Sequence, residues 1–207
     1  MGVRFFVGDQ MDNTVIIREC EDYDPQKIEA IVADGMERLG YKPSGKVFAK
    51  PNVVVAYQTE KLGRHAFTPP SFVGAGLKAI SKVPGVKQID LGENVAMGIP
   101  TRLGFEHAGY YDEMKNVKRT AGCPVDIFCI DEEPRDNLFV GGAVHDTLRV
   151  ARRMARADTK VYFPKLKCHC VSNMNSCFMQ PSARCHCRPG FTPPARLYVP
   201  NAAFVPN

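Results

Sequence analysis

The sequence predicts an α/β fold, in which a mostly parallel sheet is flanked by helices and is incomplete at the C-terminus. Short apolar segments rich in β-branched residues alternate with segments that carry apolar side chains at helical spacing. Parallel strands need such helical crossovers, and the helices then cover the faces of the sheet. The chain of 207 residues is 44% hydrophobic and 24% charged, which is typical of a soluble globular protein.

The first elements are expected to be a strand followed by a helix. Residues 13–20 (NTVIIREC) have the β-branched density of a strand. A helix follows, because Asp24 can cap it, Pro25 suits its first position and Gly40 suits its end. Its apolar stripe consists of Ile28, Ile31, Val32, Met36 and Leu39.

The next three elements form a strand, a helix and a strand. The segment GKVFAKPNVVVAY holds a short strand that ends near Lys50, because Pro51 cannot donate to a ladder. The segment PSFVGAGLKAISKV predicts a helix that begins at Pro70 or Ser71. The segment GVKQIDLGEN predicts a strand that runs into a turn at residues 92–94.

The later segments have a weaker pattern. We expect a weak helix in GFEHAGYYDEMKNV, a strand in VDIFCID and an extended segment in DNLFVGG. The segment TLRVARRMARAD predicts a short helix, and TKVYFPKLK predicts a strand that Pro164 interrupts. We therefore assign residues 13–177 to a partial α/β domain and residues 178–207 to a poorly structured tail rich in Pro, Arg and Cys.

The net charge of +5 is unevenly distributed along the chain. Residues 1–158 carry a net charge of −1, whereas residues 159–207 hold six basic residues and no acid. A globally basic nucleic-acid-binding protein is therefore not indicated. No apolar run approaches the ~20 residues of a membrane-spanning helix, and the N-terminus lacks a secretory signal pattern. We expect a cytoplasmic protein that binds no membrane.

Polar residues follow the predicted strands at the points where they end. In an open parallel sheet, ligands bind at the carboxyl ends of the strands. Three lysines there could form a positive pocket for a carboxylate or phosphate, and Glu93 could counter them, bind a cation or act as a base. The alternative is that the lysines are solvated at the starts of loops. The candidate residues are Lys50, Asn52, Glu93, Lys165, Lys167 and His169.

Four motifs, taken in order, resemble the family called Domain of unknown function 362. They are Lys50-Pro51-Asn52, Thr68 with Pro70, Gly92-Glu93-Asn94, and Ala157-Asp158 through Pro164-Lys165 to Lys167 and His169. The resemblance covers about residues 15–175, and it implies an α/β domain whose functional surface surrounds the first and last motifs. Some relatives carry ferredoxin-like iron–sulfur modules, which implies a redox setting. This chain has no Cys-x-x-Cys, so that module is absent.

The leading hypothesis is a protein that binds an anionic small molecule or cofactor. The lysines would neutralise the anion, Asn52 would orient it, and His169 would act as an acid, a base or a ligand. The residues assign no reaction, no cofactor and no protein partner.

A second hypothesis is a zinc or iron–sulfur module. The spacing C-x-C-x6-C-x7-C-x-C differs from the C-x2–4-C pairs of structural zinc sites, so an incidental cysteine-rich tail is the alternative. Its ligands would be Cys168, Cys170, Cys177, Cys185 and Cys187.

A third hypothesis is a non-functional fragment of a longer protein. In the family, the Lys-x-Lys-x-His motif leads into an Asn- and Gly-containing segment. Here it leads into the tail rich in Pro, Arg and Cys, as a truncated or frame-shifted reading frame would produce.

Overall fold

The computed structural model describes residues 14–53, 66–95, 99–141, 146–169, 173–175 and 197–198. Its helices are α1 (Pro25–Arg38), α2 (Pro70–Ser81), α3 (Thr101–His107), α4 (Tyr110–Thr120) and α5 (Arg152–Ala155). Its strands are β1 (Gly45–Pro51), β2 (Val86–Glu93), β3 (Val125–Cys129), β4 (Arg135–Phe139), β5 (Thr147–Ala151), β6 (Thr159–Phe163), β7 (Lys167–His169), β8 (Asn173–Asn175) and β9 (Leu197–Tyr198). No helix among these residues is both long and apolar enough to span a membrane.

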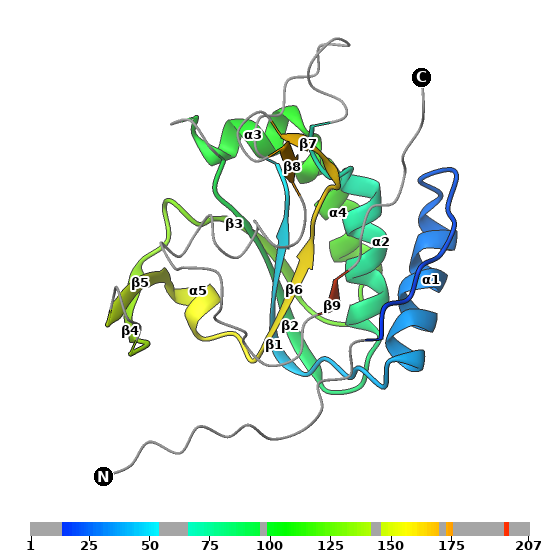
Figure 1. Cartoon of the computed structure of the whole chain (residues 1–207), viewed down its shortest axis with the longest axis horizontal. Coiled ribbons are helices and arrows are strands. Elements are labelled where there is room, and N and C mark those ends of the chain that lie inside the picture. The colour runs from blue at the N-terminus through cyan, green and yellow to red at the C-terminus, as the bar shows by residue number, and fades with distance from the viewer. Residues whose placement is uncertain are drawn as a thin grey trace.

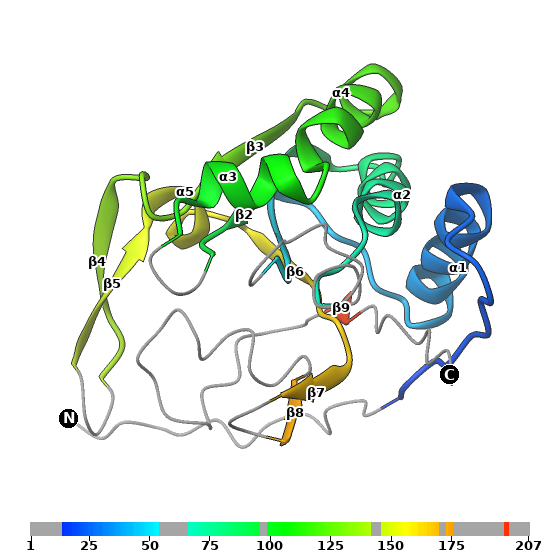
Figure 2. The same ribbon diagram turned by 90° about the horizontal axis from the view of Figure 1, so that it is seen from above.

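The central sheet is parallel and confirms the predicted α/β fold. Its strand order is β3-β2-β1-β6-β9, and each neighbouring pair runs parallel. Helices α1, α2 and α4 lie along one face, whereas α5 and the antiparallel ribbon of β4 and β5 lie on the other side (Figures 1 and 2). The sheet is therefore covered on both faces, as parallel sheets generally are.

Strand β1 shows how the two faces are filled. Val47 and Ala49 belong to the main core together with residues of α1, α2 and α4. Phe48 points to the opposite face and packs in a second cluster with Phe128 and Met154. Because alternate residues of a strand face opposite sides and both sides are covered, Val47, Phe48 and Ala49 form a continuous apolar run rather than an alternating pattern.

The order of the strands reverses between β1 and β6. From β1 the chain moves outward through β2 to β3, and it then returns to place β6 on the free side of β1. In open parallel sheets such a reversal leaves a crevice outside the carboxyl ends of the two strands, and ligands bind there. The sequence does not determine where this point lies.

Helix α1 follows its predicted boundaries. The Asp24 side chain accepts hydrogen bonds from the backbone N–H groups of Gln26 at 2.8 Å and Lys27 at 3.4 Å, which satisfies unpaired donors of the first turn. Gly40 follows the helix with a φ of 60°, in the left-handed region that glycine tolerates. The cap and stop signals in the sequence therefore correspond to the real ends of the helix.

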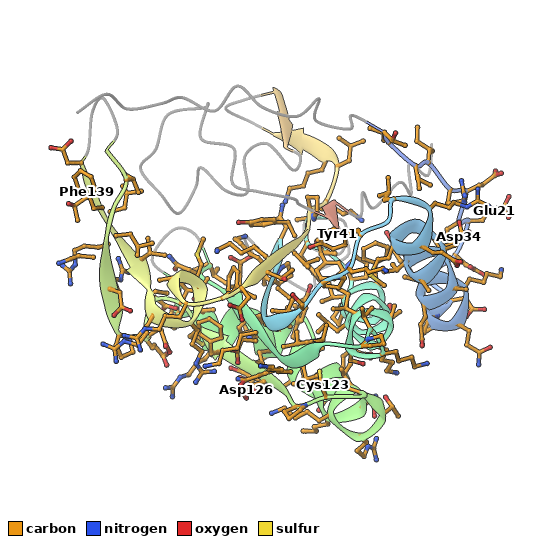
Figure 3. The ribbon with its side chains drawn as sticks, turned by 90° about the horizontal axis from the view of Figure 1, so that it is seen from below. Glu21, Asp34, Tyr41, Cys123, Asp126 and Phe139 are labelled. Atoms are coloured by element: carbon orange, nitrogen blue, oxygen red, sulfur yellow. The ribbon has the colours of Figure 1, made fainter. Side chains whose placement is uncertain are left out.

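The expected strand at residues 13–20 is wrong for the part that the structure describes. Residues 14–20 form no strand, and the side chains of Val15 and Ile17 are each 76% exposed. The segment is held by an ion pair between Arg18 and Asp34 of α1, 2.8 Å apart; Asp34 is labelled in Figure 3. β-branched residues favour strands only when a neighbouring strand accepts them, and none does so here within the described residues.

Two segments in the second half of the domain also differ from expectation. The weak helix expected around residues 104–117 is in fact two helices, α3 and α4, separated at Gly109 with a φ of 79°. The expected helix after residue 146 begins as strand β5, which pairs with β4, and only residues 152–155 are helical. Phe139, at the end of β4, is 80% exposed on the outer part of this ribbon (Figure 3).

The interruption at Pro164 is confirmed, since β6 ends at Phe163 and β7 begins at Lys167. Of the tail expected at residues 178–207, the structure describes only β9, which pairs with β6. The domain boundary at residue 177 stays a prediction.

Candidate functional site

Five of the six predicted polar residues lie at or just after the carboxyl ends of β1, β2 and β6. Neighbouring strands bring them together, since Lys50 lies beside Tyr162 in the register of β1 and β6. Helix α3 and strands β7 and β8 lie beyond this end, at the top of Figure 1. We call this group of residues the strand-end site; its members are Lys50, Asn52, Glu93, Lys165 and Lys167.

A buried ion pair ties the ends of β1 and β2 together. The Lys50 Nζ lies 3.2 Å from each carboxylate oxygen of Glu93, and it also donates to the carbonyl oxygen of Pro51 at 2.9 Å. The Glu93 carboxylate accepts from the backbone N–H of Val53 at 3.0 Å and of Asn94 at 2.8 Å. Both side chains are at most 3% exposed, so each charge is compensated inside the protein.

Thr68 connects the segments that surround the site. Its backbone N–H donates to the carbonyl oxygen of Asn52 at 2.8 Å, and its hydroxyl donates to the carbonyl oxygen of Phe163 at 2.8 Å. The Tyr110 hydroxyl, at the start of α4, donates to the Thr68 carbonyl oxygen at 2.7 Å. Burial, together with the nearby Glu93 charge, holds the pKa of Tyr110 well above its ordinary value, so the hydroxyl remains a donor.

Thr68 was not among the predicted site residues. The signal that could have identified it is its place in the Thr-x-Pro motif just before helix α2. A threonine immediately before a helix is ordinarily assigned to capping. Here the hydroxyl bonds across to the end of β6, which no local pattern predicts.

The Asn52 side chain is a buried amide just after the end of β1. The residue is 1% exposed, and within the described part of the chain neither the amide nitrogen nor the amide oxygen has a partner. Most buried polar side chains in native proteins are satisfied, and burying an amide without a partner costs roughly 1–3 kcal/mol. A molecule that bonds to both atoms would remove this cost.

Lys165 and Lys167 follow the end of β6 in extended backbone. Alternation places both lysines on one side and the half-exposed Leu166 on the other. The Lys165 Nζ lies 3.1 Å from the hydroxyl oxygen of Tyr23 and 5.6 Å from the centre of its ring, and Lys165 is only 6% exposed. The Lys167 Nζ donates to the carbonyl oxygen of Ala66.

Neither lysine has an ion-pair partner among the residues for which side chains are described. Burial, and secondarily the positive charge of Lys165, lower the pKa of Lys167 to about 8, whereas Glu93 opposes this shift. The strand-end site therefore combines three lysines with one carboxylate. An anion is the species that this arrangement is suited to accept.

One part of the fourth motif lies away from this site. The Asp158 carboxylate accepts from the backbone N–H of Lys46 at 2.8 Å, at the amino ends of β1 and β6. Gly45 there has a φ of 66°, and a β-carbon on it would meet the Asp158 side chain. This aspartate therefore joins the two strands at the end of the sheet opposite the strand-end site.

The remaining predicted residues are only partly covered by the structure. His169 lies in β7, paired with Asn173, but its side chain is outside the described residues. The same holds for the side chain of Cys168, and the other four cysteines of the proposed metal module lie entirely outside the described residues. Among the residues that are described, no group of three or more His, Cys, Asp and Glu side chains could hold a metal ion.

Comparison with known proteins gives one match. The family model described as Domain of unknown function (DUF362) matches residues 47–178, which is more than half of the chain. No curated protein and no solved structure matches this chain. The matched residues include β2, β3, β6, all but the first two residues of β1, and every member of the strand-end site.

Proposed function

The chain belongs to the DUF362 family, a domain of unknown function. We propose that it binds an anionic small molecule or cofactor at the strand-end site. The observation that carries the proposal is the pair Lys165 and Lys167. They are two lysines of the same charge in a poorly solvated place, and no described carboxylate pairs with either. Buried charges are stable in proteins mainly when they are paired, so a bound carboxylate or phosphate would supply what is missing.

The place of these residues in the sheet supports the proposal. They lie where the order of the strands reverses between β1 and β6, which is the usual ligand position in open parallel sheets. The Asn52 amide, which has no hydrogen-bond partner within the described part of the chain, lies at the same end, after β1. We propose that Asn52 orients the ligand by donating from its nitrogen and accepting at its oxygen.

The ion pair of Lys50 and Glu93 has a different role in this proposal. Its charges compensate each other, so we assign the excess positive charge to Lys165 and Lys167 and treat the pair as the support that fixes both strand ends. His169 remains a candidate acid, base or ligand group. The proposal also includes a redox setting, which rests on the family resemblance, and a cytoplasmic location, which rests on the sequence.

The first prediction concerns ligand binding itself. A thermal-shift screen of small carboxylates and phosphates should yield anions that raise the melting temperature, and calorimetry would then give their affinities. Replacing Lys167 by methionine should weaken binding by roughly 10- to 100-fold, because a hydrogen bond to a charged group contributes about 1.5–3 kcal/mol. The matched control is Lys115→Met, which removes an exposed lysine of α4.

The result for the control decides the interpretation. Equal affinities for Lys167→Met and Lys115→Met would contradict the assignment of Lys167. A screen in which no carboxylate or phosphate stabilises the protein would contradict the proposed function as a whole.

The second prediction concerns pH. With a pKa of about 8, Lys167 is largely protonated at pH 7 and largely neutral at pH 9. An anion binds the protonated form better, so its affinity should fall as the pH rises through 8, and the protein should take up protons on binding near pH 8. Calorimetry in two buffers of different ionisation enthalpy measures this uptake. Lys167→Arg, which stays charged, should flatten the profile between pH 7 and 9; an unchanged slope would assign the titration to another group.

A further inference from the structure

Lys167 has the surroundings of an amine that can act as a nucleophile. Its Nζ is held by donation to the carbonyl oxygen of Ala66, and the lysine two residues before it carries the same charge. No described carboxylate lies within ion-pair distance to hold the group as an ammonium. Desolvation and a neighbouring cation are the two conditions that activate lysine amines in proteins.

We propose that the ε-amine of Lys167 forms a Schiff base with an aldehyde or ketone carbonyl of the anionic ligand. The inference rests on the proposed function, because the anionic group of the ligand brings the carbonyl carbon to the amine. Lys165, held by Tyr23, would bind that anionic group. The ligand class is therefore a small anion that also carries a carbonyl, such as a 2-oxo acid or a phosphorylated aldehyde.

The protonation state of Lys167 supports this role. A lysine with a pKa of about 8 has roughly two hundred times more neutral amine at pH 7 than one with the ordinary value of ~10.4. Only the neutral amine carries the lone pair that attacks a carbonyl. An ordinary surface lysine would react far more slowly with the same compound.

The condensation is balanced without any further reagent. The nitrogen lone pair forms a bond to the carbonyl carbon, and a proton passes from nitrogen to oxygen to give a carbinolamine. The carbon–oxygen bond then breaks as the nitrogen lone pair forms the C=N bond, and the hydroxyl leaves with a proton as water.

Asn52 is tied to the same short segment as Lys167, and we assign it to the same step. The backbone carbonyl oxygen of Asn52 accepts from the backbone N–H of Thr68, and Lys167 donates to the backbone carbonyl oxygen of Ala66, so both residues are anchored on the short segment 66–68. The hydroxyl of a carbinolamine can both donate and accept a hydrogen bond. It therefore matches an amide whose nitrogen and oxygen are both without a partner within the described residues.

The test is reductive trapping on the full chain. The protein is incubated near pH 7 with sodium cyanoborohydride and either pyruvate or glycolaldehyde phosphate, and the modified lysines are mapped by mass spectrometry of peptides. We expect one reduced adduct on Lys167, formed at least tenfold faster than on an exposed lysine such as Lys115. The two compounds distinguish a carboxylate from a phosphate as the anionic group.

Two controls separate the inference from the function on which it rests. Lys167→Arg keeps the charge but has no amine that forms a stable imine, so it should lose the adduct. Binding of lactate, which lacks the carbonyl, and of inorganic phosphate is measured separately on the wild-type protein. Binding of lactate or phosphate to the wild-type protein without any adduct would contradict the Schiff base alone. Failure of all four compounds to bind would contradict the proposed function too, and adducts spread evenly over exposed lysines would contradict the special reactivity of Lys167.

Discussion

Replacing Lys50 by methionine should lower the free energy of unfolding by about 3–5 kcal/mol, because it leaves the buried Glu93 carboxylate without its cation. Lys50 is 3% exposed and its ammonium lies 3.2 Å from the Glu93 carboxylate. Without the ammonium, little water can reach the carboxylate to solvate its charge. Urea denaturation followed by circular dichroism measures the loss.

A matched exposed pair provides the control. Lys115 lies 2.7 Å from Asp112 on α4, but both side chains are more than 70% exposed, so Lys115→Met should change the stability by less than about 1 kcal/mol. The double variant Lys50→Met/Glu93→Gln should lose less stability than the two single variants together, because removing both charges leaves neither uncompensated. Equal effects of Lys50→Met and Lys115→Met would show that the pair is not buried as described.

Replacing Gly92 by alanine should destabilise the protein by about 1–3 kcal/mol, because the sheet has no room for a side chain there. A β-carbon on Gly92 would lie 2.6 Å from the ring of Phe128 and 2.8 Å from that of Phe48. Both rings belong to the cluster under α5 and the β4–β5 ribbon, so neither can move out into solvent. Because Glu93 follows directly, the strain should also weaken anion binding, which calorimetry would detect.

Gly35 is the matched control for this change. It lies inside α1, and a β-carbon there would meet no atom within 4 Å. Gly35→Ala should therefore stabilise the protein by about 0.5–1 kcal/mol, since alanine favours helix and reduces the freedom of the unfolded chain. Opposite signs for the two substitutions are the expected outcome, and a neutral Gly92→Ala would contradict the close packing between β2 and the aromatic rings.

Both predictions concern the framework of the strand-end site rather than its ligand. The ion pair of Lys50 and Glu93 ties the end of β1 to the end of β2, and Gly92 lies directly before Glu93 in β2. Lys165, Lys167 and Asn52 follow the ends of the neighbouring strands β6 and β1. We expect Lys50→Met and Gly92→Ala to weaken anion binding only in proportion to their loss of stability. Lys167→Met should weaken binding without lowering stability, which would separate residues that support the site from those that bind the ligand.

The sequence by itself determined the elements whose signals are local. The cap at Asp24, the proline that opens α2 and the break at Pro164 correspond to real boundaries, because each depends on backbone chemistry within a few residues. The rule that ligands gather at the ends of parallel strands also selected residues that the fold brings together. The local pattern failed at residues 14–20, where strand formation depends on a neighbour that the pattern cannot supply.

Only the tertiary structure decided which of the three lysines is already paired. Lys50 and Glu93 are 43 residues apart in the chain, and Lys167 and Ala66 are 101 apart, so their contacts exist only after the strands have taken their order. Whether a charge is compensated depends on burial and on distances of a few ångströms, neither of which is written in the sequence. For this reason the sequence could name the residues of the site, whereas the structure was needed to divide them into a framework and a group still suited to receive an anion.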